Sequence, residues 1–205
     1  MPFSKNVFIN CPFDDEYKPL LKSMLFTLLY LDFQPKISET LSSFNIRINQ
    51  IKKYIKDSKL AIHDLSRSRP MRRNDLPRFN MPYELGLDIG CITYGARKFK
   101  QKSLLIFETE NYHYQKVLSD IAGQDIKSHG DDPQRLVSQV RNWLSALNSR
   151  KILPGPTEIW LAFNQFTDDI NTKLKRRGYT RSQIKNMPTG DYIKFARSWI
   201  EEFKS

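Results

Sequence analysis

Short apolar runs alternate along the chain with stretches of helical periodicity, and this alternation restricts the fold more than any other feature. Three largely apolar runs, at 6–10, 60–62 and 103–107, predict strands of a parallel sheet that is buried on both faces. Between them, apolar residues recur at helical spacing over about 17–32, 48–56 and 82–92, which predicts crossover helices. The chain therefore begins as a βαβαβαβ unit.

Weaker patterns extend this unit. The segment 34–38 predicts a short edge strand, since Pro35 is tolerated only where no ladder hydrogen bond is required. A weak helix is expected over 114–121, a fifth strand over 125–129, and a helix over 133–147 that opens at Pro133. Five strands with intervening helices predict an α/β fold with a five-stranded parallel sheet and helices on both faces.

The sequence Leu153-Pro154-Gly155-Pro156 interrupts the pattern and predicts a boundary between an α/β domain, 1–150, and a basic helical extension, 151–205. Helices are expected over 158–174, 180–185 and 190–203, with Thr180 as a start signal and Thr189 with Asp191 as a second cap. The last helix carries an apolar stripe: Tyr192, Phe195, Ala196, Trp199, Ile200, Phe203. We expect this stripe to face the core, with a partner or dimer surface as the alternative.

The 205-residue chain has a formal net charge of +11, which predicts attraction to polyanions such as nucleic acid or nucleotide phosphates. One basic cluster lies in the loop after the third strand: Arg67, Arg69, Arg72, Arg73, Arg78. A second lies near the C-terminus: Lys173, Lys175, Arg176, Arg177, Arg181. The second cluster suits a solvated helix end equally well, because basic residues there complement the helix dipole.

Nothing in the sequence predicts a membrane segment or a metal site. The longest apolar stretch, 20–31, contains Lys22 and is too short to span a bilayer, and the first residues leave no room for a signal peptide. The two cysteines, Cys11 and Cys91, lack metal-ligand spacing and fit reduced interior thiols, although Cys11 at a strand end could be reactive. These features predict a cytoplasmic protein without membrane contact.

Glu84 is the leading candidate for a functional residue. It lies in the segment 78–86, where Pro82 suits the first turn of a helix and the following residues are largely apolar. Gly86 and Gly90, four residues apart, would let one helix face approach its neighbour closely. A carboxylate in a first helical turn is also favoured by the helix dipole, so a purely structural role is the alternative.

Polar residues follow the first and third predicted strands, at the edge where an open α/β sheet collects ligands. After the first strand come Asn10, Cys11, Pro12, Phe13, Asp14, and after the third come His63, Asp64, Ser66, Arg67. We expect Asp14, Asp64 and Ser66 to converge there with Glu84. The structural alternatives are a hydrogen-bonded core histidine at 63, a loop-capping aspartate at 64 and turn-stabilising asparagines at 10 and 80.

The segments 7–14, 61–66 and 80–86 together resemble a bacterial TIR-like domain, and they are equally similar to the nucleoside 2-deoxyribosyltransferases. The resemblance covers roughly 6–147 and implies a flavodoxin-like (TIR-like) fold. Both families place a glutamate beside the sugar of a nucleoside or dinucleotide, which implies that Glu84 is catalytic. By the same resemblance Asp64 would act around the base. From their positions after the two strands and at the helix start, we expect the following residues to bind substrate: Asn10, Cys11, Pro12, Phe13, Asp14, His63, Ser66, Arg67, Asn80, Tyr83.

The chain departs from the deoxyribosyltransferase pattern at Met81-Pro82 and in the arginine-rich insertion before the helix, which favours a phosphorylated ligand over a simple nucleoside. Cleavage of an N-glycosidic bond passes through an oxocarbenium-like state that a carboxylate stabilises or attacks. The nicotinamide of NAD is already cationic at its ring nitrogen while it is attached to the ribose, so it can depart without a proton and one carboxylate could suffice, whereas a neutral base needs protonation from Asp64 or His63.

Three functions remain open at this point. The first is hydrolysis or cyclisation of NAD, as a substrate rather than a cofactor, in bacterial antiviral defence or nucleotide signalling, with a homo-oligomer or an activating partner protein. The second is a nucleoside or nucleotide transferase or hydrolase. The third is a non-enzymatic module that binds a nucleotide or nucleic acid through the basic loop and C-terminal helices. Walker-type, nucleophile-elbow and dinucleotide glycine motifs are absent from the sequence.

Overall fold

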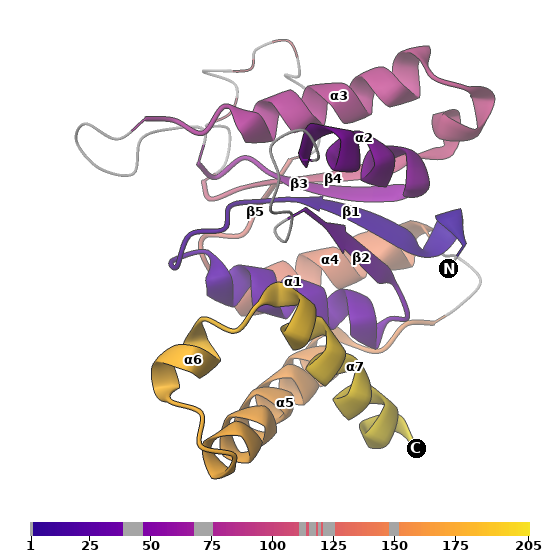
Figure 1. Ribbon diagram of the computed structural model, residues 1–205. Coiled ribbons are helices and arrows are strands. Elements are labelled where there is room, and N and C mark those ends of the chain that lie inside the picture. The colour runs from indigo at the N-terminus through magenta and orange to yellow at the C-terminus, as the bar shows by residue number, and fades with distance from the viewer. Residues whose placement is uncertain are drawn as a thin grey trace.

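A computed structural model describes residues 2–38, 47–67, 76–110, 114, 118, 120, 126–147 and 152–205. Its centre is a five-stranded, all-parallel sheet in the order β2-β1-β3-β4-β5 (Figure 1). The strands are β1 (Asn6–Asn10), β2 (Gln34–Ile37), β3 (Leu60–Asp64), β4 (Ser103–Glu108) and β5 (Lys127–Ser128). This order is that of flavodoxin-like folds, in which the strand order reverses between β1 and β3 and opens a crevice there.

Helices form layers on both sides of the sheet (Figure 1). Helices α2 (Arg47–Asp57) and α3 (Asn80–Tyr94) cover one face, and α1 (Lys18–Tyr30) and α4 (Pro133–Leu147) cover the other. Beyond α1 and α4 lie α5 (Pro156–Arg176), α6 (Arg181–Lys185) and α7 (Thr189–Lys204). Two 3-10 helices, η1 (Phe3–Lys5) and η2 (Arg97–Gln101), precede β1 and β4. The expected α/β fold with C-terminal helices is confirmed.

Side chains along the central strands alternate between the two faces, as the period of two in a β-strand requires. Val7, Ile9 and Ile62 pack into the core beneath α1 and α4, whereas Phe8 and Ala61 pack against α2. The same alternation continues to the end of β3. His63 therefore points toward α3, and Asp64 points toward α1.

The C-terminal helices share a core with the sheet. Ile159, Phe166 and Ala196 belong to the same buried cluster as Val7 and Ile9. The ring of Phe166 stacks on Phe26 of α1 with centroids 5.3 Å apart. The apolar stripe of α7 thus faces the core, and the sequence break at 153–156 marks the start of a helix without interrupting the hydrophobic interior.

Two helix starts bear on the sequence predictions. Thr180 and Gln183 form a capping box at the start of α6, as expected from Thr180. The cap expected from Thr189 and Asp191 is wrong, because α7 begins at Thr189 after Pro188 and has no side-chain cap. The predicted fifth strand shortens to β5, and the helix expected over 114–121 lies largely outside the described residues.

Helix α3 differs from expectation in two ways. It begins at Asn80, so Glu84 is the fifth helical residue and the first turn contains no acid. Simple stabilisation of a first-turn carboxylate by the helix dipole therefore does not account for Glu84. The expected close approach at Gly86 and Gly90 is also wrong, since a Cβ at either position would meet nothing within 4 Å.

Among the described residues, none of the helices has the length and apolar character needed to cross a bilayer. Cys11 is buried and Cys91 is half-buried, and neither takes part in a disulfide. Both positions agree with the expected interior thiols.

Candidate active site

Glu84 lies on the inner side of α3, where it is only 4% exposed. No hydrogen bond or ion pair to its carboxyl group is present within the described part of the chain. Burial raises the pKa of Glu84 to about 7, against the opposing charge of Arg47 at the start of α2. An acid with such a pKa exchanges its proton near neutral pH, as a catalytic carboxyl group must.

Asn10 connects the end of β1 to the first turn of α3. Its side-chain amide donates to the Met81 carbonyl at 2.9 Å, and the same nitrogen lies 3.0 Å from Nδ1 of His63. Because a carbonyl only accepts, the Asn10 amide nitrogen must face Met81, and its second hydrogen is then directed at His63. The Asn10 amide is thereby fixed one turn before Glu84, with its Oδ1 left unengaged among the described residues.

His63 continues this chain of contacts into the core. Since its Nδ1 accepts from Asn10, its Nε2 carries the proton and donates to Asp88 Oδ2 at 3.2 Å. Asp88 is one helical turn beyond Glu84 on the inner side of α3, and His63 and Asp88 are both fully buried. Histidine 63 is therefore a core residue with both ring nitrogens occupied.

Lys102, directly before β4, ends the chain of contacts. Its ammonium lies 3.2 Å from Asp88 Oδ1 and donates to the carbonyls of Ile55 and Ser58 at 2.8 and 2.5 Å. The two carbonyls accept hydrogen bonds from the ammonium, whereas Asp88 Oδ1 contacts it as an ion pair and has no hydrogen bond from the described residues. A buried charge is tolerated only when it is paired in this way. We call Asn10, His63, Asp88 and Lys102 the α3 polar network.

Asp64 forms a second network on the α1 side of the sheet. Its carboxylate accepts hydrogen bonds from Tyr17 at 2.6 Å, from the Ser66 backbone at 2.8 Å and from His129 Nε2 at 3.0 Å. The Ser66 hydroxyl makes a further short contact to Asp64. His129 Nδ1 accepts from the Asp131 backbone, which leaves Nε2 as the protonated nitrogen. We call Tyr17, Asp64, Ser66 and His129 the α1 polar network.

The α1 polar network fits a structural role for Asp64 better than the predicted role around a base. Burial raises the pKa of Asp64, but hydrogen bonds from His129, Ser66 and Tyr17 outweigh it and hold the pKa below its usual value. A fully buried carboxylate with a low pKa is a poor proton donor. The network ties β3 to the start of α1 and the end of β5.

Asp14, after β1, lies with two of the predicted arginines. Arg67 Nε and Nη2 each donate to its carboxylate at 3.2 Å, and Arg78 Nη2 is 3.7 Å away. Burial raises the pKa of Asp14, but Arg67 and Arg78 outweigh that effect and lower it. Arg67 is nearly buried, whereas the Arg78 side chain is 46% exposed. Arg69, Arg72 and Arg73 lie outside the described residues.

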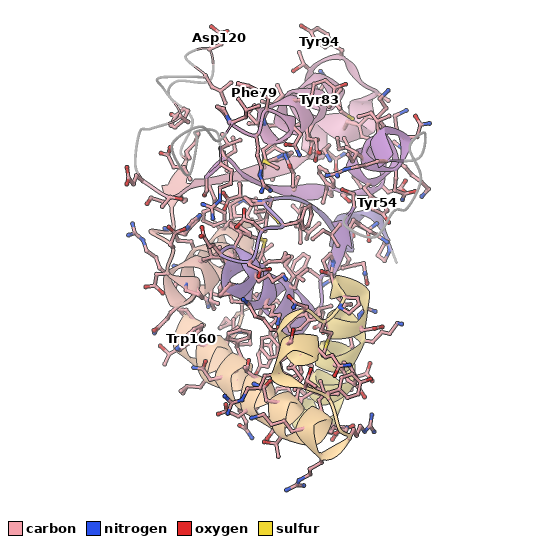
Figure 2. All side chains as sticks on the ribbon, turned by 60° about the vertical axis from the view of Figure 1, so that its left-hand side comes forward. Tyr54, Phe79, Tyr83, Tyr94, Asp120 and Trp160 are labelled. Atoms are coloured by element: carbon pink, nitrogen blue, oxygen red, sulfur yellow. The ribbon has the colours of Figure 1, made fainter. Side chains whose placement is uncertain are left out.

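The remaining predicted residues divide by exposure. Cys11 and Pro12 are buried and Phe13 is half-buried, as part of the loop that leads to Asp14. Asn80 is exposed and Tyr83 is 57% exposed. Figure 2 shows Tyr83 and Phe79 on the outer side of α3. Asn80 and Tyr83 are therefore exposed, unlike the buried Glu84, and their contact with a substrate stays a prediction.

The expected single cluster is replaced by two groups on opposite faces of the sheet. Asp64 and Ser66 belong to the α1 polar network, whereas Glu84 lies beneath α3 near Asn10 and the α3 polar network. The period of two in β3 is the physical reason, because adjacent residues cannot point to the same face. The described residues contain no hydrogen bond or ion pair that joins Glu84 to Asp14, Asp64 or Ser66.

Four network residues were absent from the predicted site: Tyr17, Asp88, Lys102, His129. A signal was available for Asp88, because it follows Glu84 by four residues and therefore shares its helix face. Lys102 and His129 carried no comparable signal, since their partners are distant in sequence.

No cluster of three or more histidine, cysteine or acidic side chains that could hold a metal occurs among the described residues. Comparison of the chain with protein-family models, curated proteins and solved structures gave no match.

Proposed function

We propose that this protein cleaves the N-glycosidic bond of a nucleotide, with NAD as the favoured substrate and Glu84 as the catalytic carboxylate. The observation that carries the proposal is a carboxyl group that is 4% exposed, has a pKa of about 7, and has no hydrogen-bond partner within the described residues. It lies beside the β1 and β3 ends, where flavodoxin-like folds bind nucleotides. The resemblance to TIR-like domains supports the same chemistry and adds a role in antiviral defence or nucleotide signalling.

In the proposed reaction the ionised Glu84 carboxylate stabilises or attacks the anomeric carbon as positive charge develops there. Asn10 Oδ1, fixed by the contacts of its amide to Met81 and His63, would accept a hydrogen bond from a ribose hydroxyl. Arg78, half-exposed beside Asp14, would contact a phosphate. Glu84 would thus act at the anomeric carbon, Asn10 at the ribose and Arg78 at the phosphate, and bond cleavage would need no second carboxylate.

Because Asp64 and His63 are already hydrogen-bonded within the protein, NAD is favoured over a nucleoside with a neutral base. Asp64 and His63 were the predicted proton donors, but both are fully buried and hydrogen-bonded to other side chains. Nicotinamide leaves from NAD as a neutral molecule without being protonated, because its ring nitrogen already carries positive charge. A site with one available carboxyl group therefore suits NAD.

To test the proposal, wild-type protein and the Glu84→Gln variant are each incubated with NAD and, separately, with deoxynucleosides. Chromatography measures the nicotinamide or free base that is released. We expect nicotinamide release, and a loss of about 100-fold or more in the Glu84→Gln variant, as for removal of a principal electrostatic group. Glu202→Gln, in the exposed last turns of α7, is the matched control and should retain activity. Equal turnover by both variants would overturn the assignment of Glu84.

A nucleoside or nucleotide transferase or hydrolase is the second candidate, and the raised pKa of Glu84 is the observation in its favour. Below pH 7 the carboxyl group is mostly protonated and could itself donate a proton to a neutral leaving base. The two candidates predict opposite pH profiles. Activity that needs the carboxylate rises as pH increases through about 7, whereas activity that needs the acid falls over the same range.

A further inference from the structure

A cavity of about 320 Å³ lies between α1 and the C-terminal helices, away from Glu84. Its wall comes from α1, α5, α6, the following turn and α7, which come together in the lower part of Figure 1. Its volume is within the range of small-molecule sites. We call it the basic cavity, and its lining residues are Lys22, Phe166, Thr167, Ile170, Asn171, Lys175, Arg181, Ile184, Lys185, Met187 and Tyr192.

One part of the wall is apolar. Ile170 and Met187 are half-buried and Ile184 is 9% exposed, so these side chains present accessible apolar surface, whereas the fully buried ring of Phe166 meets Tyr192 edge to face at 5.6 Å. The Tyr192 hydroxyl donates to the Lys22 carbonyl at 2.9 Å, which fixes the ring. This wall offers a rigid surface for a hydrocarbon or aromatic group.

The rest of the wall is positively charged. Lys22, Lys175, Arg181 and Lys185 line the cavity, and none of the described lining residues is acidic. Lys22 is half-buried, and burial together with the charge of Lys18 lowers its pKa. Lys185 contacts Asp15 at 3.3 Å, but that carboxylate lies outside the lining. An anion in the cavity would be attracted by these four cations.

We propose that the basic cavity binds a small amphiphilic anion, in which an apolar chain or ring carries a phosphate, sulfate or carboxylate group. The apolar part would lie against Ile170, Ile184 and Met187. The anionic part would contact Lys22 and Arg181. Charge complementarity and the mixed wall carry this proposal, and it is independent of the chemistry at Glu84.

The test uses 8-anilinonaphthalene-1-sulfonate, an aromatic sulfonate whose fluorescence rises in apolar surroundings, with decyl phosphate as competitor. We expect saturable binding that decyl phosphate displaces and inorganic phosphate at the same concentration does not. A Lys22→Met/Arg181→Met variant should weaken binding about tenfold or more through loss of two ionic contacts. Asn171→Trp, which fills the cavity without changing its charge, should weaken binding to a similar extent.

The matched control is Lys173→Met/Arg177→Met, which removes two cations of the same region that do not line the cavity. Urea unfolding of every variant verifies that it is folded. Retained affinity in the control supports the proposal, whereas an equal loss in both double variants shows general attraction of anions and overturns it. Undiminished binding by Asn171→Trp also overturns it.

A second arm identifies the source of the anion, a free metabolite or a lipid headgroup. Phosphatidylglycerol vesicles are sedimented with wild-type protein and with the Asn171→Trp variant. Vesicle binding that Asn171→Trp abolishes supports the cavity and assigns it to a lipid. Displacement by decyl phosphate without vesicle binding supports the cavity and assigns it to a free ligand. Vesicle binding that is equal in both proteins, without displacement by decyl phosphate, overturns the proposal.

Discussion

At the scale of single residues, the fold places two of its buried carboxyl groups, those of Asp64 and Glu84, in opposite electrostatic environments. Asp64 receives hydrogen bonds from three different residues and its pKa is lowered. Glu84 has burial without hydrogen bonds among the described residues, and its pKa is raised to about 7. Burial of an acid without hydrogen bonds to its carboxylate costs stability, and such costs concentrate at functional sites.

The stability cost of Glu84 depends on pH with a defined sign. Its pKa in the folded protein, about 7, exceeds the ordinary value of 4.5, so ionisation destabilises the fold as pH rises between these values. We expect Glu84→Gln to be more stable than the wild type at pH 8 by up to about 3 kcal/mol, with the difference vanishing near pH 4.5. Urea unfolding at both pH values measures this difference. A difference independent of pH, or one shared by Glu202→Gln, would contradict the prediction.

Replacing Asp64, unlike replacing Glu84, should lower the free energy of unfolding, because the Asp64 carboxylate accepts several buried hydrogen bonds. In Asp64→Asn an amide replaces one acceptor oxygen, so donors from Tyr17, Ser66 or His129 lose their partner. We expect the free energy of unfolding at pH 7 to fall by about 2–4 kcal/mol while the folded protein still cleaves NAD. Asp14→Asn, at a partly exposed carboxylate, should cost less. Abolished cleavage in a folded Asp64→Asn protein would restore its catalytic assignment.

The sequence predicted the environment of Glu84 better than that of Asp64. The sequence indicated Glu84 because it is an acid at the start of a largely apolar helix, and the structure buries its side chain on the inner side of α3. The role of Asp64 depends on His129, which lies 65 residues away in sequence. Burial and partner identity at such a site are set by packing, so a strand-end aspartate has the same sequence appearance in a structural and a catalytic role.

At the scale of elements, α3 is held against the sheet by a buried ion pair as well as by apolar packing. Met81 and Leu85 pack on Ile106, and Asp88 pairs with Lys102 and His63 in the interior. The Lys102 ammonium also donates to the carbonyl of Ile55 in the last turn of α2 and to that of Ser58, the residue after the helix. One side chain thereby sets the spacing of α2, α3 and β4.

A double-mutant cycle tests the interaction between Asp88 and Lys102. Lys102→Met leaves the Asp88 carboxylate buried without its cation and should cost about 3–5 kcal/mol, as for other broken buried pairs. Asp88→Asn combined with Lys102→Met should cost less than the sum of the single changes, with a coupling of about 1–3 kcal/mol in urea unfolding. The exposed pair Lys53 and Asp57 on α2 is the control and should show much weaker coupling. Additive costs at Asp88 and Lys102 would show that the pair does not act as a unit.

Element positions were well predicted where a pattern was long. The helices expected over 48–56 and 133–147 correspond to α2 and α4, because their apolar faces repeat over several turns. The start of α3 was misplaced by two residues, since Asn80 and Met81 precede the proline that served as the start signal. That small shift removes Glu84 from the first turn and changes the explanation of its position.

At the scale of the whole molecule, a continuous interior joins the sheet, α1 and the C-terminal helices. Phe26 of α1 contacts Phe166 of α5 and Trp199 of α7 at centroid distances of 5.3 and 5.9 Å. Sequence composition indicated a boundary near 153–156, but Pro and Gly mark turns and do not report which faces pack together. The shared interior predicts that the chain unfolds as one cooperative unit.

Phe166→Ala tests this cooperativity. Removal of a fully buried ring should lower the free energy of unfolding by about 3–5 kcal/mol, in a single transition seen equally by far-UV circular dichroism and tryptophan fluorescence. Leu161→Ala, on the exposed side of the same helix, should change it by no more than about 0.5 kcal/mol. Two separate transitions would instead identify residues 156–205 as an independent unit.

Because His63 and Asp64 point to opposite faces of the sheet, the number of residues in β3 cannot change without disrupting both polar networks. Inserting one residue before His63 would carry its imidazole to the α1 side and the Asp64 carboxylate to the α3 side. Tyr17 and His129 would then lose their acceptor, while Asp88 and Asn10 would lose the ring between them. Both networks would fail together, so homologous chains should vary in length in the loops and preserve the number of residues in this strand.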